Sequence, residues 1–230
     1  MQVLQFNIKY FFFLFWGLFA LLQQTLAQDL KVISRYGDYK DSVQNDSLQK
    51  MVEIKHFVPS VAYDLRYATK ENFTGEKLYK SGGKTFLRLP AAEALCKAAR
   101  EFAGIGYTIK IWDAYRPYSV TKKMWELIYD DRYVADPSKG SGHNRGLAVD
   151  LTLMKDGKEL DMGTGFDNFT DTAHRDFSKL PESVLKNRLF LQTTMEKYGF
   201  KGLSTEWWHF AFPNDGRYGV LNIDFKKLAH

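Results

Sequence analysis

The chain has 230 residues, 45% of them hydrophobic, which is enough to bury one sizeable core. Its formal net charge is a mild +5, and no basic run is present. A nucleic-acid binder is therefore not expected, because such proteins use rows of Lys and Arg to neutralise phosphates. One cysteine, Cys96, cannot form an internal disulfide and is expected to be a small buried apolar residue.

The first 27 residues are expected to be a signal peptide (1–27). Lys9 precedes an apolar run over 10–22, and the small residues Thr25 and Ala27 precede the expected cleavage after Ala27. The run is short for a membrane span, and an uncleaved anchor is the alternative. Cleavage would lower the net charge by one, to +4, and leave no stable membrane span. We therefore expect an exported, periplasmic protein.

Residues 28–50 are polar and lack a periodic pattern, so we expect a flexible polar leader or an outer flap there, before a single compact domain over 51–230. Helical patterns then cover 90–102, 119–129 and 182–198, and strand patterns cover 107–112, 148–154 and 207–212. Asp156-Gly157 is typical of a two-residue hairpin turn. Because strands and helices do not alternate regularly, the sequence predicts an α+β fold with a central antiparallel sheet flanked by helices.

Two short segments contain side chains suited to a metal site, Ser141 to Asp150 and Glu206 to His209. In the first, branched residues from Leu147 onward alternate with small ones, which is the period of a strand. Asp150 lies on the small-residue face, where there is room for an ion and a substrate. The sequence thus predicts a metal site on the sheet.

A hydrolytic zinc centre needs three protein ligands, an open position for water and a base beside that water. His143, Asp150 and His209 can be the ligands of one Zn²⁺ per chain, and Glu206 the base. Regular pleating would put Glu206 and His209 on opposite faces of their strand. We therefore expect Glu206 at an irregular strand entry or a bulge.

A single histidine beside aromatic residues is more often a core residue than a ligand. The prediction therefore depends on the combination of two histidines, an aspartate on a small-residue face and a glutamate three positions before the second histidine. The remaining histidines, His56, His174 and His230, are each expected to be structural. His174, in a polar loop, is the alternative ligand.

These residues resemble those of the D-alanyl-D-alanine dipeptidase family. The resemblance includes Ser-Gly-His with the following Asp150, Glu-Trp-Trp-His, and two further stretches at 67–75 and 112–117. It covers the chain from about Val52 to Phe225. One departure is Gly142, where the family member compared has a serine.

The resemblance implies a role for each matching residue. It implies metal ligands at His143, Asp150 and His209, the general base at Glu206 and a transition-state-stabilising arginine at Arg116. It also implies that the amino group of the substrate is bound at Asp167, with Ser141 and Tyr67 nearby.

The residues around Arg116 and Asp167 can also be interpreted without the resemblance. Arg116 follows a predicted strand, and Pro117 favours an extended backbone at Arg116. The alternative for Arg116 is a surface arginine paired with Asp113. The alternative for Asp167 is an ordinary turn residue. The long segments 130–142 and 158–180 are expected to form the walls of the site.

The function expected from the resemblance is zinc-dependent hydrolysis of the D-alanyl-D-alanine dipeptide to two D-alanines, in cell-wall peptide metabolism. The partner would be a small-molecule dipeptide. Two alternatives are a zinc D,D- or L,D-carboxypeptidase acting on peptidoglycan stem peptides and a non-catalytic zinc-dependent cell-wall-binding module. The module would have no need of Glu206 or Arg116.

Overall fold

The computed structural model describes residues 30–80 and 82–229. The expected signal peptide at 1–27 and the terminal His230 lie outside the described residues. Across the part that is described, no helix combines the length and the hydrophobicity needed to cross a lipid bilayer.

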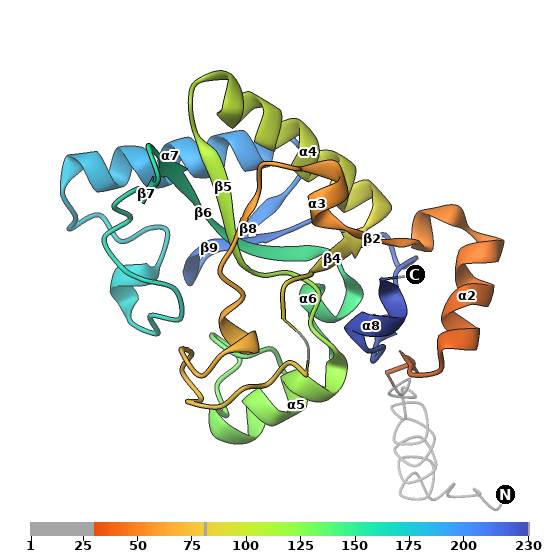
Figure 1. Ribbon diagram of the computed structural model, residues 1–230. Helices are drawn as coiled ribbons and strands as arrows, with labels where there is room; N and C mark the ends of the chain where they lie inside the picture. The colour runs from red at the N-terminus through yellow and green to blue at the C-terminus, as the bar shows by residue number, and fades with distance from the viewer. Residues whose placement is uncertain (1–29, 81, 230) are drawn as a thin grey trace, which may run out of the picture. The chain divides into compact units, whose positions relative to one another are not determined.

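A six-stranded sheet forms the centre of the fold (Figure 1). Its order is β3-β5-β6-β9-β8, and β7 pairs with β6. The strands are β3 (Ala62–Tyr63), β5 (Thr108–Asp113), β6 (Ala148–Lys155), β7 (Lys158–Glu159), β8 (Lys201–Leu203) and β9 (Glu206–Ala211). The expected α+β fold is confirmed, and the pairs are antiparallel apart from the short parallel pair of β3 with β5.

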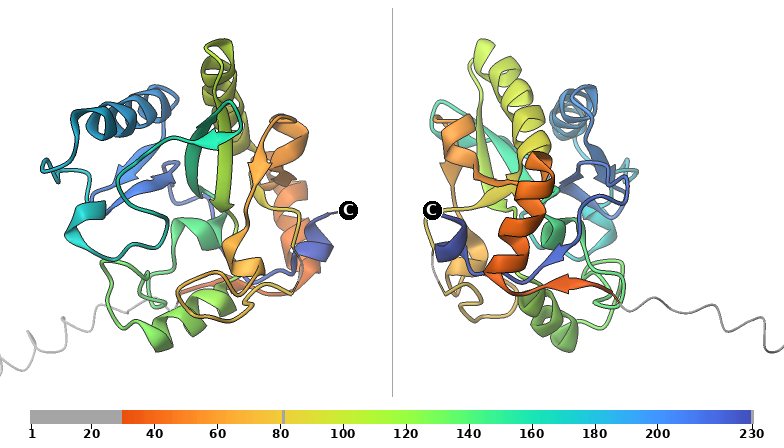
Figure 2. Two further views of the ribbon diagram at one scale, coloured as in Figure 1. Left: turned by 60° about the vertical axis from the view of Figure 1, so that its left-hand side comes forward. Right: turned by 90° about the vertical axis from the view of Figure 1, so that its right-hand side faces the viewer.

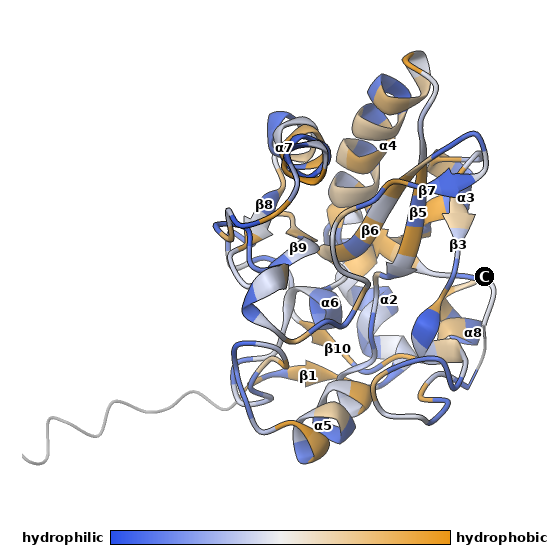
Figure 3. Cartoon of the chain, turned by 90° about the vertical axis from the view of Figure 1, so that its left-hand side faces the viewer, coloured by the Kyte–Doolittle hydropathy of each residue, from blue (hydrophilic) through white to orange (hydrophobic). Residues whose placement is uncertain are grey.

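Two long helices, α4 (Leu89–Gly104) and α7 (Glu182–Lys197), pack against the sheet and against each other (Figure 2). The first contacts β5, and the second contacts β8 and β9. The branched side chains of β6 join the same buried cluster as residues of both helices. Figure 3 shows hydrophobic and hydrophilic residues mixed on both helices, as expected for helices with one face on a sheet. The polar face of β6 is thereby left for the candidate site.

The other helices are shorter. They are α2 (Tyr36–Asn45), α3 (Ile54–Phe57), α5 (Tyr118–Leu127), α6 (Gly142–Arg145) and α8 (Phe225–Leu228), with 3-10 turns η1 (Ser47–Gln49), η2 (Arg66–Ala68) and η3 (Asp171–Ala173). Two small sheets complete the fold: β1 (Val32–Ile33) with β10 (Val220–Leu221), and β2 (Met51–Glu53) with β4 (Phe86–Arg88). The predicted helices at 90–102, 119–129 and 182–198 are therefore confirmed as α4, α5 and α7.

The hairpin after β6 is also confirmed. Lys155 pairs with Lys158, and both intervening residues, Asp156 and Gly157, have positive φ angles of 50° and 76°. Two left-handed residues in succession make the turn that matches the twist of antiparallel strands.

The expectation of a flexible leader at 28–50 is wrong for residues 32–49, which form β1, α2 and η1. Tyr39 of α2 is buried, and its hydroxyl accepts a 2.8 Å hydrogen bond from the Met51 amide. The Gln49 side chain donates to the Arg217 carbonyl at 2.8 Å. The segment is held in place by the contacts of Tyr39 and Gln49 and by the backbone pairing of β1 with β10. Neither kind of contact produces a periodic pattern in the sequence.

Candidate metal centre

Asp150 and His209 are cross-strand neighbours. The pairing of β6 with β9 places Asp150 opposite His209, so both side chains emerge side by side on one face of the sheet. The two residues are 59 positions apart in the chain, and their contact is Asp150 Oδ1 to His209 Nδ1 at 2.9 Å. The register of the sheet thus creates half of the site.

His143 reaches the same point from the one-turn helix α6. The Ser141 hydroxyl accepts from the Asn144 amide, and the Asn144 side chain accepts in return from the Ser141 amide, which is a capping box. Gly146 ends the turn in the left-handed conformation, where an added Cβ would lie 2.5 Å from the Met51 side chain. At Gly142 an added Cβ would lie 3.0 Å from that of Ala148. The serine found in the compared family member would therefore crowd β6 here.

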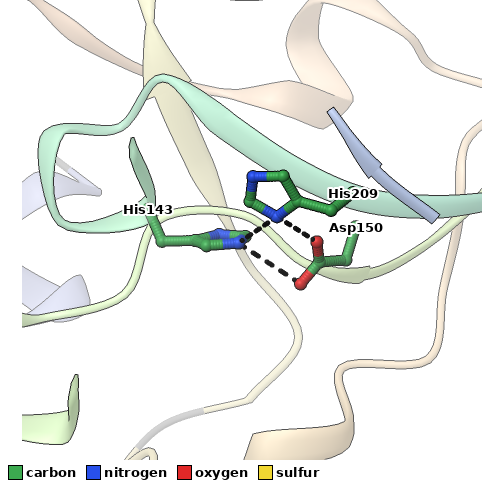
Figure 4. Close-up of side chains that lie close together, drawn as sticks. All are labelled: His143, Asp150 and His209. Carbon is green, nitrogen blue, oxygen red and sulfur yellow. Dashed lines mark hydrogen bonds and ion pairs between the residues drawn. The ribbon is translucent and has the colours of Figure 1, made fainter. Parts of the chain in front are cut away.

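The three side chains converge on one point (Figure 4). His143 Nε2 lies 3.1 Å from His209 Nδ1 and 3.3 Å from Asp150 Oδ2. Ligand atoms bound tetrahedrally at ~2.0–2.2 Å from Zn²⁺ lie roughly 3.3–3.6 Å apart. The observed triangle is close to that spacing, so the donor set fits a metal ion.

The orientation of His143 is also suited to metal binding. Its Nδ1 lies 2.7 Å from the Ala114 carbonyl oxygen, which can only accept, so Nδ1 carries the proton and Nε2 presents a lone pair. Burial lowers the pKa of His209, which favours the neutral imidazole that a metal requires. Burial opposes ionisation of Asp150, but His143 and His209 hold its pKa below the usual range. The shifts at His209 and Asp150 thus both favour the protonation states that bind a metal ion.

Glu206 lies at the irregular start of β9, as the sequence predicts. The β8–β9 register shifts between Gly202, opposite Phe210, and Leu203, opposite Glu206. The Glu206 carboxylate lies 3.8 Å from His209 Nδ1 and is buried. Burial, with the nearby charges of Asp150 and Asp167, raises its pKa well above the usual range. A carboxylate of raised basicity beside the triangle is suited to accept a proton.

Arg116 is buried, so its reading as a surface arginine is wrong, although its pairing with Asp113 is present. Its Nε donates to Asp113 Oδ2 at 2.9 Å, and its guanidinium lies 5.0 Å from the Tyr67 ring centre. A terminal nitrogen is 3.9 Å from Asp150 Oδ2. The guanidinium is thus fixed beside the metal triangle.

Asp167 and Tyr67 form the other side of the site. The Tyr67 hydroxyl donates to Asp167 Oδ1 at 2.9 Å. Asp167 has a φ of 59°, a conformation that Asp tolerates better than most residues. Burial raises the pKa of Asp167 to about 7. Ser141, the third residue expected here, also lines the cavity, but its hydroxyl already caps α6.

These side chains surround a cavity of about 210 Å³. This is smaller than the ~300–1,000 Å³ of pockets that take drug-sized ligands. Residues 131–135, 141 and 142 come from the first expected wall, which is confirmed, whereas the second segment contributes only Asp167 to the lining. The lining also includes Phe73 and Trp208, from two of the family-like stretches, and Met124 and Leu203, which the sequence did not single out.

The other histidines lie elsewhere. His174 is absent from the triangle and from the cavity lining, and its Nε2 is 3.9 Å from Asp171. His56 is exposed on α3. His174 is therefore not the alternative ligand in this arrangement.

The sheet of this α+β domain carries a His-Asp-His triangle beside a carboxylate that can accept a proton. This combination defines the site of a metallopeptidase. The family model described as D-ala-D-ala dipeptidase, in peptidase family M15, matches residues 47–228. The chain belongs to this family, and the resemblance seen in the sequence is confirmed.

Curated relatives support the assignment. A D-alanyl-D-alanine dipeptidase of Escherichia coli K12 is 36% identical, over 76% of this chain and 91% of its own length. One of Enterococcus faecium is 31% identical, over 75% of this chain and 95% of its own. Among solved structures, the LdcB LD-carboxypeptidase aligns with a TM-score of 0.39 and 22% identity, covering 58% of this chain and 64% of that one.

Proposed function

We propose that the protein hydrolyses D-alanyl-D-alanine to two D-alanines, using one zinc ion held by His143, Asp150 and His209. The observation that carries the proposal is the juxtaposition of this triangle with Glu206 on one side and Asp167 on the other, around one small cavity. The curated relatives of this chain are named for the same dipeptide.

The two imidazole nitrogens and one carboxylate suit zinc, and three protein ligands leave a position open. When bound, zinc would make water a stronger nucleophile near neutral pH and polarise the scissile carbonyl. Glu206 takes the proton from the attacking water and delivers it to the leaving amine. Burial raises the pKa of Glu206, which makes its carboxylate a stronger proton acceptor than an exposed one.

Arg116 stabilises the negative charge that develops on the carbonyl oxygen. Its charge is permanent, and the buried site strengthens its field. The contact with Asp113 fixes the planar guanidinium in place before substrate arrives, so little reorganisation is needed during the reaction.

Asp167 binds the free amino group of the dipeptide. Its carboxylate carries a single hydrogen bond from Tyr67 among the described residues, which leaves acceptor positions free. A cationic ammonium would supply the partner that this part-buried carboxylate lacks. Since a longer or N-blocked peptide has no ammonium at this position, the arrangement favours the free dipeptide over stem peptides.

The direct test is to incubate the zinc-loaded protein with D-alanyl-D-alanine, its L,L counterpart and its N-acetylated D,D form, and to measure released alanine. Cleavage of the free D,D dipeptide alone is expected. Cleavage of the blocked form would instead favour the carboxypeptidase function. No cleavage of any substrate would favour the non-catalytic wall-binding module.

We also propose that the protein acts outside the inner membrane, on the basis of the signal-like sequence at 1–27. An exported dipeptidase would not reach the cytoplasmic dipeptide before it enters wall precursors, so resistance by precursor depletion is not expected. Cell fractionation with N-terminal sequencing tests this. A mature start at Gln28 in the periplasm is expected, and an intact Met1 in the cytoplasm would disprove it.

A further inference from the structure

The irregular pairing of β8 with β9 brings two functional residues of one strand to one site. Gly202 is opposite Phe210, and the next residue, Leu203, is opposite Glu206. Residues 207–209 therefore have no paired residue on β8. In a regular strand Glu206 and His209 would point to opposite faces. The bulge is what turns both toward the metal site.

The Arg175 side chain forms hydrogen bonds to the backbone of both strands at this bulge. It lies just after η3, and its Nε donates to the Leu203 carbonyl at 2.8 Å while a terminal nitrogen donates to the His209 carbonyl at 2.8 Å. Its own backbone amide donates to the Ser204 carbonyl at 2.9 Å. One guanidinium thus joins the backbone of β8 to the backbone of the metal ligand His209.

The two short hydrogen bonds of the Arg175 guanidinium go to backbone carbonyls, and a third, at 3.5 Å, goes to the Gln192 side chain. No ion pair joins it to a carboxylate within residues 30–80 and 82–229, and its guanidinium lies 4.4 Å from the Phe210 ring centre. Burial lowers the pKa of Arg175 to about 10, so retaining the charge there has a cost. Charged donors form the stronger hydrogen bonds to carbonyls, which offsets that cost.

Gly202 provides the space for this guanidinium. A Cβ added at Gly202 would lie 2.4 Å from Arg175 Cζ and 2.5 Å from its Nε. The glycine has no positive φ, so its backbone alone does not require glycine. The Arg175 guanidinium can therefore occupy its position only because residue 202 has no side chain.

We propose that Arg175, accommodated by Gly202, is a positioning residue that fixes the β9 bulge and thereby sets Glu206 and His209 relative to one another. The part concerning Glu206 rests on the proposed hydrolytic function. The part concerning His209 requires only that the triangle binds a metal ion.

The test compares Arg175→Ala, Gly202→Ala and the double variant. The measurements are kcat and KM for D-alanyl-D-alanine, and the zinc dissociation constant by competition with a chelator. Each single variant is expected to lose roughly 10–100-fold in kcat and in zinc affinity, as for other residues that orient metal ligands. KM is expected to change less, because Asp167 and Tyr67 lie outside the bulge.

The double variant separates positioning from general damage. Gly202→Ala displaces only the flexible end of Arg175, so it should leave the fold intact and have little further effect once Arg175 is Ala. Losses that multiply in the double variant would overturn the proposal, as would normal kcat and zinc affinity in Arg175→Ala.

Two controls complete the experiment. Phe102→Leu trims a fully buried side chain of α4 and should lower stability while keeping zinc affinity. Gly37→Ala, where an added Cβ meets nothing within 4 Å, should change neither. If the wild-type protein hydrolysed no dipeptide, the proposed function would fail, and the zinc affinities would still decide whether Arg175 positions His209.

Discussion

Tyr79 and Asp113 form a 2.5 Å hydrogen bond, in which the Tyr79 hydroxyl donates to Asp113 Oδ1. The other oxygen of that carboxylate accepts from Arg116 Nε. Asp113 is completely buried, so it is held between a tyrosine and the arginine of the site. Tyr79 does not line the cavity, and its hydroxyl reaches the site through Asp113, while its ring packs edge-on against Tyr67 with the ring centres 5.9 Å apart.

Arg116→Ala is expected to lower kcat/KM for D-alanyl-D-alanine because it removes about 3 kcal/mol of transition-state stabilisation. Removal of an oxyanion donor has an effect of this size in other hydrolases. The substitution also leaves Asp113 buried with one partner fewer, so stability should fall as well. Steady-state kinetics at saturating zinc measure the first effect. A catalytic efficiency equal to that of the wild type would eliminate the assigned role.

Tyr79→Phe is expected to lower kcat/KM by about 1 kcal/mol, roughly fivefold, because one hydrogen bond that orients Asp113 is lost. The effect should disappear in the Arg116→Ala background, since Tyr79 acts through Arg116. Kinetics of the two single variants and the double variant test this. An equal loss in both backgrounds would show that Tyr79 acts by another route.

Glu206→Gln should retain zinc and lose hydrolysis by about 10²–10⁴-fold, because the amide cannot accept a proton. Metal content is measured on the purified variant, and turnover with the free dipeptide. Glu206 is not one of the triangle residues, so zinc binding should persist. Near-normal turnover would show that another group is the base.

Asp167→Asn should stabilise the zinc-free protein at pH 8, by about 2 kcal/mol after partial solvent screening. The folded-state pKa of Asp167 is raised from 3.8 to about 7, so ionisation costs stability as pH rises through that window. The difference in the free energy of unfolding between Asp167→Asn and the wild type should therefore become smaller as the pH falls from 8 to 5. Denaturant unfolding at the two pH values measures it, and a gap independent of pH would contradict the assignment.

Removing zinc with a chelator should lower the unfolding temperature, and adding zinc back should restore it, because the ion binds the folded triangle. His209→Ala should abolish most of this shift. The matched control is His56→Ala, on the exposed surface of α3, which should keep the full shift. Equal shifts in both variants would place the ion elsewhere.

The sequence indicated the three residues that converge in the triangle because their signals are local. Alternation along β6 identifies the face of Asp150, and the spacing of Glu206 and His209 requires a bulge, which the register of β9 contains. The partners of those residues are not local. Asp113 meets Tyr79, and Arg175 meets His209, through contacts across 34 positions in each case. No pattern within a single segment indicates such pairs.

The same distinction accounts for the missed segment before residue 50. Its stability comes from pairing with β10 and from the burial of Tyr39, and neither depends on a hydrophobic period. The parallel strand β3 was missed for a related reason, since two residues are too few to show alternation.

The pairing of Val32 with Val220 joins the beginning and the end of the described chain. Such a contact has a very long sequence separation, and contacts of this kind form slowly because a large loop must close first. During synthesis β1 therefore has no partner until Val220 and Leu221 have been made. Completion of the fold at this edge must therefore wait until nearly two hundred residues after β1 have been made.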